Sequence, residues 1–494
     1  MCSPVEEPGI VSVPVDAASP EPCLPPPAPT RRFDRSIVEG PLPAAVWKLA
    51  WPTMLTNAIG GLQGIVDHAM VGHFVGYTGN AGIGVALQIH IVMIVFTTSL
   101  FTGMSILVAR CVGAADAVMA DRVVYQAFLT TTVLAILVVA PAGYLASPWL
   151  LQFVNATPAV QAEALPYLRI SFVYSLGMLL FFLVGGALRA AGDARTPMIL
   201  GIAMTAINVV LNVILIPGLG PIPAFGTAGA AIGTVTAAGV VSAYSLWKLW
   251  RGGWVVSFPA GLGYRPDWAI IRALLHFGLP TGVQGVVMNI GGVLLLAFIG
   301  SLAQSAEAQA AFAIAYSQLF SLVTWTAVGV MGAAATTAGQ NLGAGHYDRA
   351  EQAVHVAARI GLWVAFVLGI GFFFLPGPLL AVFGMTQPAV VDLGTHLLRV
   401  LSVSGLFVVI ALAYTGGLQG TGDTRSPMYI SLVSQIAIPL GYCFVVQRLG
   451  RLDPMDIWLA ILAGHVTRCV LSVVRFNQGQ WRSITVRVDD RRRR

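Results

Sequence analysis

Apolar residues run along most of this chain in stretches of 20 to 30 residues, separated by short polar segments. A helix needs about 20 apolar residues to cross a hydrocarbon core of roughly 30 Å. No stretch alternates apolar and polar residues with a period of two, as the strands of an outer-membrane barrel would. The pattern predicts transmembrane helices near 44–71, 81–107, 122–146, 163–188, 195–217, 226–250, 270–299, 306–335, 350–375, 391–417, 426–447 and 456–475.

Composition supports an all-α polytopic membrane protein. Of the 494 residues, 56% are hydrophobic and 10% are charged, whereas soluble domains carry about 25% charged residues. The five cysteines are scattered without CxxC or zinc spacing, so we expect no disulfide, no metal site and no cofactor. The net charge of +6 has an explanation in membrane topology, so it does not indicate nucleic-acid binding.

The two ends of the chain differ from the apolar region between them. Residues 1–38 are rich in Pro, Ala, Ser and Glu, a composition that predicts a disordered tail. The region lacks the short apolar core and cleavage site of a signal peptide. Residues 476–494 form a second polar tail, which ends in four arginines.

The distribution of basic residues predicts the orientation. With an N-terminus in the cytoplasm, only 4 of the 27 Lys and Arg fall outside: Arg169, Arg399, Arg448 and Arg451. Nine lie in the two tails and 14 near inner helix ends. This asymmetry follows the positive-inside rule and predicts twelve helices with both termini in the cytoplasm.

The chain repeats itself. GALRAAGDARTPM at 186–198 and GGLQGTGDTRSPM at 416–428 share seven identities in thirteen positions, and Arg110–Ala114 aligns with Gln340–Ala344 at the same offset of 230. We therefore expect two six-helix lobes, 39–250 and 270–475, joined by a cytoplasmic linker at 251–269. Both lobes begin on the same face, so the repeat is parallel and the substrate path is expected between the lobes, as alternating access requires.

Asp67 is the most informative residue, because it lies within an apolar helix with no Lys or Arg before Arg110. An ionised Asp at bilayer depth costs about 3 kcal/mol, and burial favours its neutral form. Such a carboxyl suits a proton-coupled cycle. The alternative is a hydrated Asp near the interface.

Helical spacing predicts neighbours for Asp67. Thr56, Gly60 and Gln63 share its face, and the fifth helix carries a stripe of Thr205, Asn208 and Asn212. Tyr167 and Tyr174 are seven residues apart on the fourth helix, which places them on one face. Polar side chains can also simply join transmembrane helices. Joining helices is therefore the alternative role for Asn208 and Asn212.

A set of motifs resembles the multidrug and toxic-compound extrusion (MATE) family. It comprises Trp47–Pro52, DHAMVG at 67–72, the paired GDARTPM and GDTRSPM loops, and QNLGAGHYDRAEQ at 340–352. The resemblance covers roughly residues 42–475. It implies twelve helices in two lobes, no enzymatic activity, and efflux of hydrophobic, often cationic small molecules in exchange for protons or sodium.

The acid in the first helix resembles the DinF-like branch of that family, in which the first helix bends when its Asp is protonated. Pro52 lies where the resemblance implies that bend; a static kink is the alternative. The chain departs from the branch at Asn212, where an Asp is usual. The acids of the NorM-like branch are also absent, since Met288, Asn289, Phe407 and Val408 occupy those helices. One carboxyl can exchange a proton unaided, so we favour protons over sodium.

Other functions fit the sequence less well. A lipid or glycolipid flippase of the wider superfamily needs basic residues in its cavity, and the spans offer almost none. A membrane enzyme needs paired acids or HExxH, and the sequence has neither. Two lobes and one acid suit alternating access better than a channel. We expect a monomer in the lipid bilayer of a bacterial plasma membrane, with Asp193 and Asp423 capping helices and pairing with Arg195 and Arg425.

Overall fold

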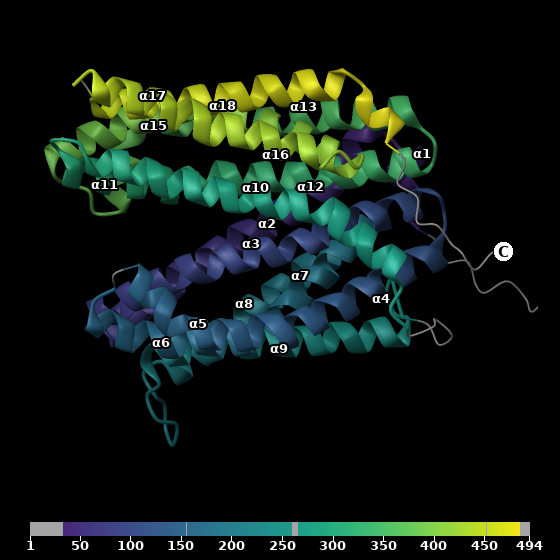
Figure 1. Ribbon diagram of the computed structural model, residues 1–494, viewed down its shortest axis with the longest axis horizontal. Coiled ribbons are helices and arrows are strands. Elements are labelled where there is room, and N and C mark those ends of the chain that lie inside the picture. The colour runs from purple at the N-terminus through teal and green to yellow at the C-terminus, as the bar shows by residue number, and fades with distance from the viewer. Residues whose placement is uncertain (1–32, 155, 259–264, 451, 485–494) are drawn as a thin grey trace, which may run out of the picture.

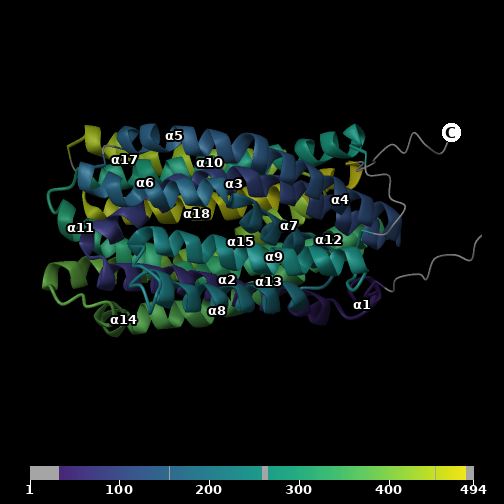
Figure 2. The same ribbon diagram turned by 90° about the horizontal axis from the view of Figure 1, so that it is seen from below.

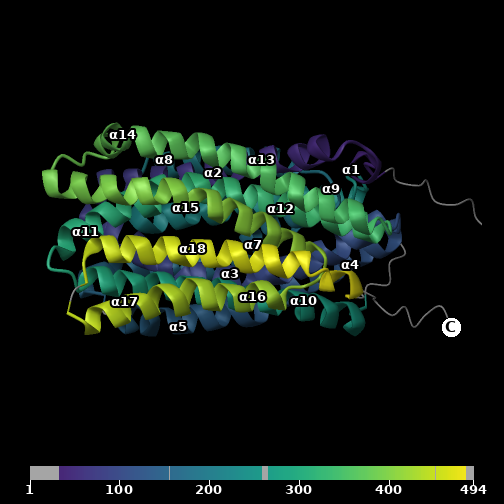
Figure 3. The ribbon, with the colours of Figure 1, turned by 90° about the horizontal axis from the view of Figure 1, so that it is seen from above.

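The computed structural model describes residues 33–154, 156–258, 265–450 and 452–484, and its long helices lie side by side along one axis (Figures 2 and 3). The first half contains α1 (Ser36–Glu39), α2 (Leu42–Phe74), α3 (Tyr77–Gly113), α4 (Ala117–Leu134), α5 (Ala140–Phe153), α6 (Pro158–Val173), α7 (Ser175–Ala190), α8 (Arg195–Leu215) and α9 (Gly226–Arg251). The second half contains α10 (Trp268–Gly300), α11 (Ser305–Phe312), α12 (Ser321–Gly343), α13 (Tyr347–Phe374), α14 (Pro376–Val382), α15 (Pro388–Gly420), α16 (Arg425–Leu432), α17 (Ile438–Arg448) and α18 (Pro454–Asn477).

These helices form the predicted twelve-span fold. Three π-helical segments, at Ala135–Val139, Ala313–Leu319 and Val433–Ala437, join α4 to α5, α11 to α12 and α16 to α17 into single spans. Within the described residues, nine helices or joined helices are long and apolar enough to cross a membrane, and the bent pair of α6 and α7 makes a tenth. With α2 and α3, which have 33 and 37 residues, the spans number twelve.

The two halves of the chain form two bundles that contact each other through matching helices. Figure 1 shows α10–α18 in its upper half and α4–α9 in its lower half, with α2 and α3 between them. Across this boundary α2 packs on α12, α3 packs on α10, and α3 packs on α12. The helices α2 and α10 are the first spans of the two halves, and α3 and α12 lie in the second spans. The contacts between the halves therefore follow an approximate two-fold relation.

Two repeat-related glycines let α3 and α12 cross closely. A Cβ on Gly113 would lie 2.0 Å from the carbonyl oxygen of Gln340, and one on Gly343 would lie 2.3 Å from that of Arg110. Arg110 donates from Nη2 to the Thr421 carbonyl at 2.8 Å, and Gln340 donates from Nε2 to the Ala190 carbonyl at 2.8 Å. The segments that repeat in sequence therefore hold the halves together in space.

The crossing lies at the end of the bundle where the described chain begins and ends, here named the termini end. Ile37 is fully buried there and accepts a hydrogen bond from Asn341 at 3.3 Å, and Lys48 pairs with Asp34. Partial burial alone would raise the pKa of Asp34, but hydrogen bonds from Lys48 and Ser36 outweigh it, so the pKa is lowered. Most of both predicted tails, and residues 259–264 of the predicted linker, fall outside the described residues.

The repeated GDARTPM and GDTRSPM loops contain helix caps, as predicted. Asp193 accepts hydrogen bonds from the amides of Arg195 and Thr196, and Asp423 accepts one from the amide of Ser426. The predicted pair of Asp423 with Arg425 is wrong. Asp423 instead pairs with Arg475 of α18 at 3.1 Å, because packing of α18 on α15 and α16 brings that distant residue to the loop.

Candidate functional site

The polar stripes predicted on α2 and α8 face each other. Asn212 is fully buried and donates from Nδ2 to Oδ1 of the half-buried Asp67 at 2.7 Å. One to two helical turns away, Thr205 donates from its hydroxyl to Oε1 of Gln63 at 2.9 Å. A spacing of four residues on α2 and of seven on α8 thus produces two matched pairs on facing sides of the helices.

Asn208 connects this cluster to α9. In one orientation its amide donates to the Thr234 hydroxyl at 3.0 Å and accepts from Asn212 at 3.3 Å. In the flipped orientation, which satisfies more of its neighbours, its nitrogen lies 3.2 Å from Oδ1 of Asp67 and its oxygen accepts from the Thr234 amide and hydroxyl. The flipped amide gives the carboxylate a second donor. Both Asn208 and Asn212 therefore turn toward the acid.

Gly233 of α9 makes room for this arrangement. A Cβ at Gly233 would lie 2.2 Å from Oδ1 of Asn212, which is buried and has no hydrogen-bond partner. An unpaired buried acceptor is costly. The cluster thus directs donors at the carboxyl of Asp67 and leaves one buried acceptor, Oδ1 of Asn212, on the side of α9.

The two tyrosines predicted to join the cluster differ in their burial. Tyr167 is buried on α6 and close enough to Asp67 to interact electrostatically with it. Tyr174 is 62% exposed and lies at the break where α6 and α7 bend by 54°. Tyr174 is the C-cap of α6, and the prediction that it shares a face with Tyr167 stays a prediction. The helix α2 continues through Pro52, and the predicted bend there stays a prediction.

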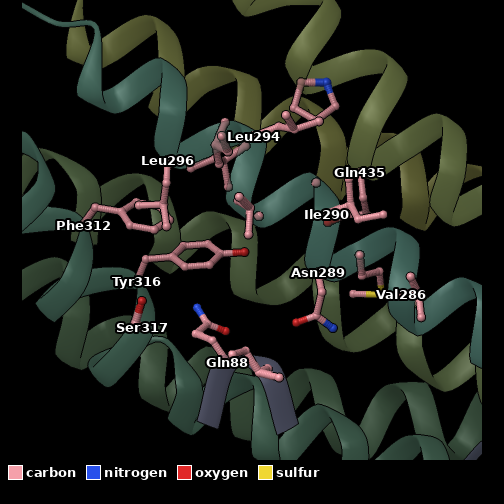
Figure 4. A pocket seen from close by; sticks show the side chains of 18 of the residues that line it. Gln88, Val286, Asn289, Ile290, Leu294, Leu296, Phe312, Tyr316, Ser317 and Gln435 are labelled. Carbon is pink, nitrogen blue, oxygen red and sulfur yellow. The ribbon is translucent and has the colours of Figure 1, made fainter. Parts of the chain in front are cut away.

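Two cavities that share lining residues lie between the halves. The larger has a volume of about 1130 Å³ and contacts α3, α5, α6, α10 and α18. Figure 4 shows Gln88, Asn289 and Tyr316 extending into it among apolar residues such as Ile290, Leu294 and Phe312. The smaller, of about 300 Å³, shares Met288, Tyr316, Gln435 and His465 with the larger. Asp67 does not line either of these two cavities.

Sequence reasoning missed a charged residue in the smaller cavity. Arg468 of α18 is only 5% exposed and lines this cavity, with His465 one turn before it. Counting basic residues by loop had placed Arg468 near an inner helix end, and the structure shows it as one basic residue in the cavity lining. The sequence signal that could have indicated this site is the pair of His465 and Arg468, which are three residues apart in an apolar helix. Within the described ranges, no group of three or more His, Cys, Asp or Glu could hold a metal ion.

Two six-helix halves, a cavity between them and a carboxyl inside one half define a polytopic membrane protein of the secondary-transporter class. A sequence profile of the MatE family matches the chain twice, at residues 52–214 and 280–443. The chain belongs to this family, the MATE transporters. The two matches fall in the two halves and cover equivalent spans of each.

Curated relatives match almost the whole chain. The probable multidrug resistance protein NorM of Thermotoga maritima is 27% identical over 452 residues, which are 90% of this chain and 94% of that protein. The probable multidrug resistance protein YoeA of Bacillus subtilis is 24% identical and covers 87% and 92%. The multidrug resistance protein MdtK of Yersinia pseudotuberculosis is 24% identical and covers 86% and 93%.

Solved structures share the fold. A crystal structure of MATE in complex with MaL6 superposes with a TM-score of 0.84 at 20% identity, covering 93% of this chain and all of that one. An outward-facing conformation of a multidrug resistance MATE family transporter gives a TM-score of 0.84 at 20% identity, covering 91% and 98%. At this identity the likeness concerns the fold.

Proposed function

We propose that this protein is a proton-coupled exporter of hydrophobic small molecules in a bacterial plasma membrane, and that Asp67 is the group that carries the proton. The observation that supports the proposal most is the hydrogen bond between Asp67 and the fully buried Asn212. An intramembrane acid with a fixed partner is a functional group by default, because an ionised acid there is costly. The curated multidrug relatives suggest export of varied compounds.

The cycle follows from the two halves and their crossing. With the termini in the cytoplasm, as the positive-inside rule predicts, the crossing of α3 and α12 closes the cytoplasmic side, and the cavities face outward. A proton from outside neutralises Asp67 and weakens its hold on Asn212. Substrate leaves, the halves rock, and the proton is released to the cytoplasm when new substrate binds.

Sodium coupling is the second candidate for the same site. Sodium needs several oxygen ligands, and Asn208, Gln63 and Asp67 could offer them. However, Asn212 turns its amide nitrogen toward Asp67, and Thr205 donates to the Gln63 oxygen. Donors directed at the carboxylate and at a neighbouring oxygen compete with a cation, which favours the proton.

Everted membrane vesicles test this proposal. We expect wild-type protein to accumulate a fluorescent cation such as ethidium when a pH gradient is imposed, and Asp67→Asn to lose this response. A sodium gradient at equal pH is expected to drive no accumulation. Transport driven by sodium alone would contradict the choice of ion, and undiminished transport by Asp67→Asn would contradict the role of Asp67.

A further inference from the structure

The guanidinium of Arg468 is buried without a counter-charge. Its side chain is 5% exposed, and its Nε has no hydrogen-bond partner. Among the residues that the structure describes, no hydrogen bond or ion pair involves Arg468, whereas Arg122 and Arg475 pair with acids. A buried charge normally requires a partner, so an arginine kept only for structure would have an acid or several carbonyls beside it.

The groups around Arg468 are mostly hydrogen-bond donors or can act as donors. His465, also 5% exposed, has no partner at Nδ1 and stacks on Phe320 with ring centroids 5.9 Å apart. The buried Nε2 of Gln435 has no acceptor, and Gln435 lines both cavities. No Asp or Glu is among the described residues that line either cavity. The smaller cavity therefore offers positive charge and unused donors, without any carboxylate.

Other walls of the smaller cavity are joined by hydrogen bonds between side chains. Gln419 donates to Oε1 of Gln284 at 3.3 Å, and Gln284 donates to the Ser431 hydroxyl at 2.8 Å, which joins α15, α10 and α16. Tyr316 and Gln435 lie in the two π-helical segments of the second half. Such segments redirect side chains locally and occur often at functional sites.

We propose that Arg468, with Gln435 and His465, forms an anion subsite that binds the carboxylate, or a comparable acid group, of an amphipathic substrate. The apolar body of that substrate occupies the larger cavity, which reaches the subsite through the shared residues Met288 and Tyr316. This inference rests on the proposed function, export through these cavities, and adds compounds that carry an acid group to the substrates expected of it. The larger cavity, at about 1130 Å³, suits a drug-sized body rather than a two-chain lipid.

The binding of two dyes that differ in one group tests the subsite. Rhodamine 110 carries a free carboxylate, and rhodamine 123 is its methyl ester. We expect purified full-length protein in neutral detergent to bind the acid more tightly than the ester, measured by fluorescence anisotropy. Arg468→Gln is expected to weaken acid binding about tenfold or more while ester binding changes less than about threefold. Arg468→Lys is expected to retain part of the preference, and the exposed Arg448→Gln all of it.

Several outcomes would overturn the subsite. The first is equal affinity of wild-type protein for the two dyes. The second is unchanged affinity of Arg468→Gln for the acid. The third is an equal loss of affinity for both dyes in Arg468→Gln and in Arg468→Lys. Displacement of rhodamine 110 by phosphatidylglycerol in mixed micelles, but not by excess benzoate, would assign the site to a lipid headgroup instead. Binding needs no ion gradient, so a failure of proton coupling leaves the test intact. Retained acid preference in Asp67→Asn would separate the two claims.

Discussion

Replacing Gly343 by Ala is expected to open the termini end of the protein. Its added Cβ would lie 2.3 Å from the carbonyl oxygen of Arg110, where an ordinary contact is at least 3.4 Å. The obstructing atom belongs to the backbone of α3, so no side-chain rotation can relieve the clash. The two helices must separate by about 1 Å, and the repeat-related Gly113 lies under the same constraint.

The size of the effect follows from the cost of overpacking. Forcing an extra carbon into a close contact typically costs about 1–3 kcal/mol. If only the state with α3 and α12 crossed suffers this cost, the equilibrium shifts toward the state open at the termini end by a factor of about 5 to 150. Gly332→Ala on the same helix meets nothing within 4 Å and provides the matched control.

Accessibility of a cysteine at the crossing measures this shift. Ala109 is 2% exposed and faces Gly339 of α12, so Ala109→Cys in a background without other cysteines reports opening. We expect a membrane-impermeant maleimide, added on the membrane side that carries the termini, to label the Gly343→Ala variant at least about fivefold faster than the Gly332→Ala variant. Equal labelling rates in the two variants would refute the closure role of the glycine crossing.

Three further predictions concern other parts of the molecule. Gly233→Ala is expected to displace Asn212, because its Oδ1 would lie 2.2 Å from the new Cβ. We expect this variant to reduce proton-driven efflux at least about tenfold. The control Gly239→Ala, whose new Cβ meets nothing within 4 Å, is expected to have little effect. Arg475→Gln leaves the buried Asp423 without its ion pair and is expected to lower the free energy of unfolding by about 1–3 kcal/mol, measured by thermal unfolding in detergent against the exposed Arg448→Gln; an unchanged melting temperature would argue against it. Hydrogen bonds keep the pKa of Asp34 below its ordinary value of 3.8, so its stabilising contact is present above that pH and is lost as pH falls through the lowered pKa. The protection factors for hydrogen exchange at residues 35–40, measured relative to the intrinsic rate at each pH, are then expected to fall in acid, and those of Asp34→Asn to be low at every pH.

The helices and the first-half cluster could be predicted because they depend on local periodicity. Asp67 and Gln63 recur at helical spacing on α2, as do Thr205 and Asn212 on α8, so their stripes met when the two helices packed. The 54° bend between α6 and α7 was not predicted, because the sequence pattern reads as one continuous apolar span.

The second-half site depends on packing between distant segments. Arg468 lies in the second half of α18 and resembles a residue of an inner helix end, whereas packing of α18 on α15 and on Val433–Ala437 places it beside the cavity. The predicted partner of Asp423 was wrong for the same reason, because its actual partner, Arg475, is 52 residues away in the chain. The repeat predicted two matching halves, but the contact between their equivalent glycines required the structure.

Proton release on substrate binding tests the role of Asp67 most directly. Purified protein in weakly buffered detergent, mixed with ethidium and followed with a pH-sensitive dye, is expected to release up to one proton per bound substrate. Asp67→Asn is expected to bind ethidium and release none, while the exposed Asp392→Asn behaves like wild type. Equal proton release by the Asp67→Asn variant and wild-type protein would contradict the assignment of Asp67 as the coupling group.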